Sequence, residues 1–76
     1  MAYKILIADD EPMLTELLSE HLQDSGYLTF VAQNSDDVIA RLSLHPDLLL
    51  LDINMPGMDG LELCKVIRDH VACPIL

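Results

Sequence analysis

The chain has 76 residues, which is enough for one small domain and too few for two. Its 13 acidic residues outnumber its 4 basic residues and give a formal charge of −9. Binding to a phosphate backbone needs clustered lysines and arginines, so this composition excludes direct nucleic-acid binding by the segment. No apolar stretch approaches the length of a membrane span or of a signal peptide, so we expect a cytoplasmic protein with no membrane partner.

The first predicted elements are a strand over 4–8 and a helix that starts at Pro12. The strand is apolar and runs directly into the acidic triplet 9–11. Pro12 suits the first turn of a helix, where its missing N–H is not needed, and Gly26 suits the C-terminal cap. Helical spacing predicts one face turned toward the core, with His21 at the core edge, made of Leu14, Leu17, Leu18, His21 and Leu22.

A second strand and a short second helix are expected next. The segment 28–32 is rich in β-forming residues but mixed in polarity, which suits a strand at the edge of a sheet. Ser35 begins a helix whose first turn carries Asp36 and Asp37, where acidic side chains favour the helix dipole, and Pro46 ends this region. Its predicted inward side chains are Val38, Ile39 and Leu42.

Consecutive leucines at 48–51 predict a third strand that is covered on both of its faces. Asp52 follows immediately, and the turn residues Pro56, Gly57 and Gly60 come after it. Asp59 is placed to cap a third helix, with Glu62 as the second member of a capping box. The apolar face of that helix is expected to comprise Leu63, Val66 and Ile67, and residues 73–76 look like the start of a fourth strand.

The alternation of strands and helices predicts an α/β fold. Right-handed crossovers between successive strands give a doubly wound parallel sheet with helices on both faces. In such sheets, ligands bind beyond the carboxyl ends of the strands. The residues that follow each strand are therefore the candidates for function.

Acidic residues follow both the first and the third predicted strand. If these strands are parallel neighbours, Asp9, Asp10 and Asp52 converge at one edge of the sheet. Clustered carboxylates repel one another unless a cation lies among them, and oxygen ligands suit Mg²⁺. The cluster is therefore a candidate Mg²⁺ site that contains a potential nucleophile. A helix cap remains an alternative interpretation of Asp10 taken alone.

The segments KILIADDE (4–11) and DINMPGMDG (52–60) together resemble the receiver domains of bacterial two-component response regulators. The resemblance extends over the whole chain. It implies a flavodoxin-like fold with strand order 2-1-3-4-5, of which this chain would supply the β-α-β-α-β-α-β portion in the order 2-1-3-4. It also implies a signalling domain, which is not an enzyme.

The resemblance implies a role for each residue of the acidic cluster. Asp52 matches the phospho-accepting aspartate, which receives a phosphoryl group from a sensor histidine kinase. Asp10 and Asp9 match the pair that holds Mg²⁺, Asp10 directly and Asp9 largely through water. Asn54 matches the position whose backbone carbonyl completes the metal site.

The chain departs from the family pattern at its C-terminal end. A complete receiver domain continues to roughly 120 residues, so residues 1–76 are expected to be the N-terminal part of one, C-terminally truncated. The Ser or Thr and the Lys that contact the phosphoryl group in the family lie beyond Leu76. We therefore expect weak Mg²⁺ binding, poor phosphorylation, and self-association through an exposed sheet edge.

Two other function classes stay open at this point. A Mg²⁺-dependent phosphohydrolase can also use an aspartate nucleophile at a strand end, although such enzymes usually carry D-x-D where this chain has Asp52-Ile53-Asn54. A flavodoxin-like electron carrier shares the fold but needs a phosphate-binding loop where this chain has acidic residues. A DNA-binding output domain, if the full-length protein has one, lies outside these residues.

Overall fold

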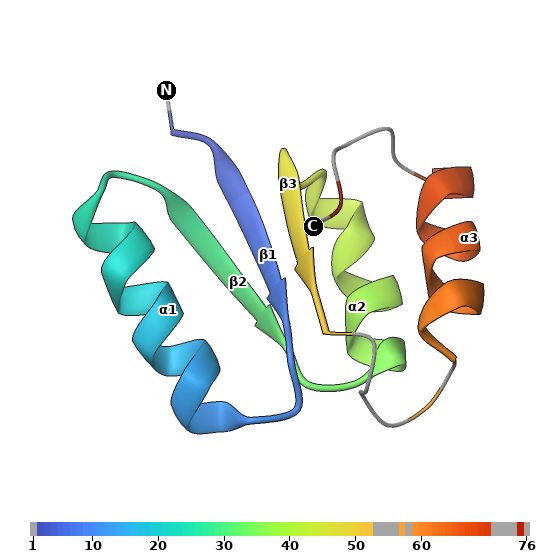
Figure 1. The fold of residues 1–76 in the computed structure, drawn as a ribbon. Helices are drawn as coiled ribbons and strands as arrows, with labels where there is room; N and C mark the ends of the chain where they lie inside the picture. The colour runs from blue at the N-terminus through green and yellow to red at the C-terminus, as the bar shows by residue number, and fades with distance from the viewer. Residues whose placement is uncertain (1, 53–56, 58, 71–74, 76) are drawn as a thin grey trace.

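The computed structural model describes residues 2–52, 57, 59–70 and 75, and these form alternating strands and helices (Figure 1). The elements, in chain order, are β1 (Lys4–Ala8), α1 (Pro12–Asp24), β2 (Leu28–Ala32), α2 (Ser35–Arg41), a short 3-10 helix η1 (Leu42–Leu44), β3 (Leu48–Leu51) and α3 (Gly60–His70). This is the predicted order. The alternation therefore identified the fold class correctly. Within the described part of the chain, no helix combines the length and the apolar character that a bilayer span requires.

The three described strands form a parallel sheet in the order β2-β1-β3, which confirms that the first and third strands are neighbours. Ala8, the last residue of β1, lies between Ala32 and Leu51, the last residues of β2 and β3. The strands therefore end level with one another. Ile75 forms a parallel bridge with Leu49, on the outer side of β3, where a fourth strand would lie. The other residues of the predicted fourth strand lie outside the described residues.

The start of β1 is tied to the start of β3 by a reciprocal pair of hydrogen bonds. The Lys4 backbone N–H donates to the Asp47 carboxylate at 2.8 Å, and the Asp47 N–H donates to the Lys4 carbonyl at 2.7 Å. The Lys4 ammonium also donates to the carbonyl of Leu44 at 3.1 Å. These bonds fix the register between β1 and β3, and they therefore determine which residues lie side by side at the carboxyl ends of the two strands.

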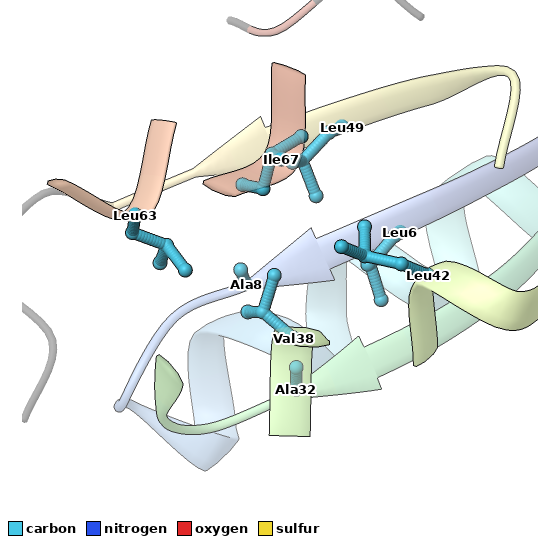
Figure 2. Packing of buried hydrophobic residues seen from close by; sticks show 8 residues of the cluster. All are labelled: Leu6, Ala8, Ala32, Val38, Leu42, Leu49, Leu63 and Ile67. Carbon is cyan, nitrogen blue, oxygen red and sulfur yellow. The ribbon is translucent and has the colours of Figure 1, made fainter. Parts of the chain in front are cut away.

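The main hydrophobic core lies between the sheet and the helix pair α2 and α3 (Figure 2). α1 lies on the other side of the sheet, over β2 and β1 (Figure 1). The buried cluster draws on the three strands and both helices and comprises Leu6, Ala8, Ala32, Val38, Leu42, Leu49, Leu63 and Ile67. The predicted inward faces of the second and third helices are thus confirmed at Val38, Leu63 and Ile67, and the predicted Leu42 is buried as the first residue of η1.

The prediction that the leucine strand is covered on both faces is confirmed on one face and holds only in part on the other. Leu49 is fully buried in the α2 and α3 core, but Leu48 and Leu50, on the opposite face, are only half-buried. They line two hollows of about 290 Å³ each, whose other walls include Leu18 and Leu22 of α1. The reason is the placement of α1, which lies over β2 and β1 and covers the same face of β3 only in part.

The predicted inward face of α1 is also partly wrong. Its one buried residue is Thr15, while Leu14 and Leu17 are 40% and 67% exposed and His21 is exposed as well. The helix turns toward the sheet through the neighbouring stripe that contains Thr15, Ser19 and the half-buried Leu18 and Leu22. A hydrogen bond of 2.5 Å between the Ser19 and Thr29 hydroxyls joins this stripe to β2. The interface between α1 and β2 therefore contains a polar contact as well as leucine side chains.

Local capping signals correctly located the ends of α1. Pro12 occupies the first helical turn, and Gly26 follows the C-cap with a φ of +94°. The Gly26 N–H donates to the Gln23 carbonyl and the Tyr27 N–H donates to the Leu22 carbonyl, at 2.9 and 3.1 Å. These paired bonds form a Schellman motif, in which a glycine is favoured because of its positive φ.

α2 is capped by Asn34, the residue before the predicted helix start. Its side-chain oxygen accepts a hydrogen bond of 2.8 Å from the Asp37 N–H. We expect Asn34→Ala to lower the free energy of unfolding by about 1 kcal/mol, because this N–H loses its partner. Urea unfolding followed by circular dichroism measures this change. Asn34→Ser, which keeps an accepting oxygen, is the control, and an equal loss in both variants would contradict the capping role.

Candidate functional site

The carboxyl edge of the sheet places two aspartates at fixed backbone positions. The Asp52 N–H donates to the Ala8 carbonyl at 2.9 Å, and the Asp9 N–H donates to the Ala32 carbonyl at 3.0 Å. The parallel hydrogen-bond ladder thus continues for one residue past β1 and β3. Both side chains start from rigid backbone, which is what a binding constellation requires.

The turn between β1 and α1 is stabilised by Asp9. Its carboxylate accepts a hydrogen bond of 3.0 Å from the Glu11 N–H, and Glu11 is the N-cap residue of α1. The interpretation of Asp10 as the helix cap is therefore wrong, since Asp10 precedes the N-cap. Asp9 is half-buried and Asp10 is exposed. With no capping role, the Asp10 carboxylate is available to a ligand from solvent.

The side chains of Asp9, Asp10 and Asp52 converge. One carboxylate oxygen from each residue lies within 4.8 Å of the oxygens from the other two. The structure thus brings together the acidic residues that the strand ends suggested. Asn54, expected to add a backbone carbonyl, lies outside the described residues.

The electrostatics of this cluster favour a cation. Each pair of carboxylates about 4 Å apart repels by about 1 kcal/mol in bulk water and by about 4 kcal/mol near a protein surface. The donor atoms are all carboxylate oxygens on half-buried or exposed residues, which is the ligand type that Mg²⁺ and other hard cations prefer. The residues present therefore fit a hydrated divalent cation.

The cluster lies at the mouth of one of the two hollows beside α1. Asp9 and Asp52 line it together with apolar side chains of β1, β3 and α1, among them Ile7, Leu18 and Leu50. This arrangement can hold a cation and present a carboxylate to an incoming electrophile.

The third helix begins where the sequence predicted. The Asp59 carboxylate accepts from the Leu61 N–H at 3.0 Å, and the Leu63 N–H donates to the Asp59 carbonyl at 2.8 Å. Asp59 is thus a cap and takes no part in the acidic cluster. One neighbouring contact was not predicted: Gly57, in the segment after Asp52, lies directly against Ser35 of α2. No sequence signal points to Ser35 except its place at a helix start.

Known proteins with the same organisation are response regulators. Residues 5–76 match the family model described as the response regulator receiver domain. The chain is 45% identical to the transcriptional regulatory protein ResD of Bacillus subtilis over 96% of its own length and 31% of that protein. It is 40% identical to the DNA-binding response regulator MtrA of Mycolicibacterium smegmatis over its whole length and 34% of MtrA. The chain thus spans about a third of these curated relatives.

Solved structures give the same result. The response regulator TrrA from Thermotoga maritima, determined in complex with Mg²⁺ and BeF, superposes with a TM-score of 0.80 at 43% identity. The match covers 88% of this chain and 59% of TrrA. Strand order, the strand-end aspartates and the family match agree. The chain belongs to the response regulator receiver domain family and is a receiver domain of the two-component type.

Proposed function

We propose that this receiver domain accepts a phosphoryl group on Asp52, transferred from a sensor histidine kinase in a Mg²⁺-dependent reaction. The observation that carries the proposal is the convergence of Asp9, Asp10 and Asp52, with oxygens within 4.8 Å of one another at the ends of β1 and β3. This convergence supports a nucleophile at Asp52 with a cation held beside it by Asp9 and Asp10.

Each residue has a defined part in the transfer. An Asp52 carboxylate oxygen attacks the phosphorus of the phosphohistidine, the P–N bond breaks, and the histidine nitrogen leaves with the bonding electrons. The product is an acyl phosphate on Asp52. Asp10 and Asp9 would hold the Mg²⁺, Asp10 directly and Asp9 largely through water, and the Asn54 carbonyl would complete its ligands. The bound cation would neutralise charge on the phosphoryl oxygens.

A small-molecule phosphodonor tests the proposal without the kinase. We expect acetyl phosphate with Mg²⁺ to produce a fraction of singly phosphorylated chain, with the modification on Asp52 in tandem mass spectrometry. Addition of EDTA should remove it. Modification at other carboxylates, or labelling that is indifferent to EDTA, would refute the assignment.

Mg²⁺ binding is expected to depend on Asp10. Asp10→Asn removes one of the clustered charges and an anionic ligand, so it should weaken Mg²⁺ binding at least about tenfold, the scale on which metal sites respond to altered ligand shells. Isothermal titration calorimetry measures the dissociation constant. Asp36→Asn, which removes an exposed acid in the first turn of α2, is the matched control. An equal loss of Mg²⁺ affinity in both variants would show that the affinity depends on net charge alone and not on a ligand at Asp10.

We infer that residues 1–76 are the N-terminal part of a receiver domain of roughly 120 residues, a size typical of single domains. The partial coverage of TrrA, 59% of its chain, supports this.

ResD and MtrA are named as transcriptional and DNA-binding regulators, so we propose that the full-length protein is cytoplasmic and couples this domain to a DNA-binding output domain. We expect no turnover of phosphomonoesters, which separates it from a phosphohydrolase.

Self-association is the second proposal on partners. The edge concerned is the side of the sheet beyond β3, where Ile75 forms a single bridge with Leu49 among the described residues. Leu48 and Leu50 of β3 are also only half-buried. Because the charge of −9 keeps copies apart, association should increase as salt screens it. Sedimentation velocity at low and high salt tests this, and a monomer at every concentration and salt would exclude it.

A further inference from the structure

Gly57 lies so close to α2 that the position has no room for a side chain. A Cβ built on Gly57 would overlap the Ser35 hydroxyl and would lie 3.3 Å from the Ser35 Cβ. Gly57 also has a φ of +106°, in the region that side chains disfavour. The backbone at Gly57 therefore rests directly on the Ser35 side chain.

Ser35 is held firmly on its own side of this contact. It is 3% exposed and is the first residue of α2. The helix start is fixed by the Asn34 cap, and Val38, one turn further on, is fully buried in the core. A side chain placed at Gly57 would therefore displace the segment that contains Gly57 more readily than it would displace α2.

The contact lies at one end of the segment that leaves the acidic cluster. At the other end, the Asp52 N–H is bonded to the Ala8 carbonyl of β1 at 2.9 Å. The chain after Asp52 is thus fixed to the sheet at its start and to α2 at Gly57, before Asp59 caps α3. Only four residues separate Asp52 from Gly57 in the sequence, so the contact with α2 lies close along the chain to the strand-end aspartate.

We propose that the steric contact between Gly57 and Ser35 positions the segment after Asp52 and thereby sets the Mg²⁺ affinity of the Asp9, Asp10 and Asp52 cluster. Ser35 is a positioning residue and does not touch the cation. The inference rests on the proposed function, since it concerns the same site. It assigns to α2 a supporting part in a site built from β1 and β3.

The two positive-φ glycines provide a matched experiment. Gly57→Ala adds both φ strain and the collision with Ser35, whereas Gly26→Ala adds φ strain alone, because nothing lies within 4 Å of its added Cβ. We expect both variants to lower the melting temperature. Only Gly57→Ala should raise the Mg²⁺ dissociation constant, by about tenfold, the lower range for altered metal-site support. Titration calorimetry well below the melting transition separates these effects.

A second substitution tests whether the contact itself is responsible. Ser35→Ala removes the colliding hydroxyl, so the double variant Ser35→Ala, Gly57→Ala should regain most of the wild-type Mg²⁺ affinity while it keeps the φ strain. If Gly57→Ala does not fold, the double variant is compared with Ser35→Ala. The Cβ added at position 57 still lies 3.3 Å from the Cβ of residue 35, so the Mg²⁺ dissociation constant of the double variant should exceed that of Ser35→Ala by less than tenfold.

The outcomes distinguish this inference from the proposed function. Wild-type binding of Mg²⁺ with unchanged affinity in Gly57→Ala, or no recovery in the double variant, would overturn the positioning role alone. A wild-type chain that does not bind Mg²⁺ would overturn the proposed function and this inference with it.

Discussion

Asp52→Asn should reduce Mg²⁺-dependent phosphoryl incorporation below the level that mass spectrometry detects, since removal of a nucleophile lowers catalysis by on the order of a thousandfold or more. An amide oxygen keeps the shape of the side chain but lacks the negative charge that attacks phosphorus. The fold should survive, because the change is isosteric and removes one charge from a cluster of like charges. Intact-mass spectrometry after treatment with acetyl phosphate measures the incorporation.

The control for this variant is an aspartate outside the cluster. Asp36→Asn makes the same chemical change at an exposed position in the first turn of α2 and should label like the wild type. Circular dichroism of both variants confirms that the fold is kept. Substantial labelling of Asp52→Asn would mean that another side chain accepts the phosphoryl group.

Leu49→Ala should lower the free energy of unfolding by about 2–5 kcal/mol, the range for deletion of a buried leucine side chain. Leu49 is 0% exposed and lies in the middle of β3, where it contributes to the core shared with α2 and α3 (Figure 2). Small domains have a total stability of only about 5–15 kcal/mol, so this variant should be close to unfolding. Urea unfolding followed by circular dichroism gives the value.

An exposed leucine provides the comparison. Leu61 in the first turn of α3 is 73% exposed, so Leu61→Ala should change the free energy of unfolding by no more than about 0.5 kcal/mol. A similar loss at both positions would contradict the assignment of the core to the α2 and α3 side of the sheet.

Local signals in the sequence located most element boundaries, because each signal has a local physical cause. Pro12 lacks an N–H that a helix start does not need, Gly26 adopts a positive φ, and Asp59 accepts a bond from the first turn of α3. None of these effects depends on distant residues. They could therefore be predicted from the order of residues alone.

The predictions that were wrong or held only in part concern contacts between elements. Apolar spacing on α1 allowed a face containing Leu14 and Leu17, but in the structure the stripe with Thr15 and Ser19 faces the sheet, where Ser19 bonds to Thr29. An unbroken apolar run such as 48–51 fits a strand buried on one face or on two. Only the position of α1 over β2 and β1 decides between them.

The same distinction between local signals and contacts between elements applies to the candidate site. The strand-end positions of Asp9 and Asp52, with parallel neighbouring strands, were enough to predict that their carboxylates meet. The contact between Gly57 and Ser35 joins segments that are distant in the sequence, and neither residue type predicts such a contact. Such support around a site depends on the packed fold, which residue order does not specify locally.

A Mg²⁺ titration followed by amide NMR tests most directly whether Asp9, Asp10 and Asp52 act as one site. The three amides should show the largest shifts in the chain and should follow a single dissociation constant, and both features should be lost in Asp10→Asn. Shifts that are equally large at the exposed Asp36 and the half-buried Asp37, or different dissociation constants for the three aspartates, would contradict a single metal site at the end of β1 and β3.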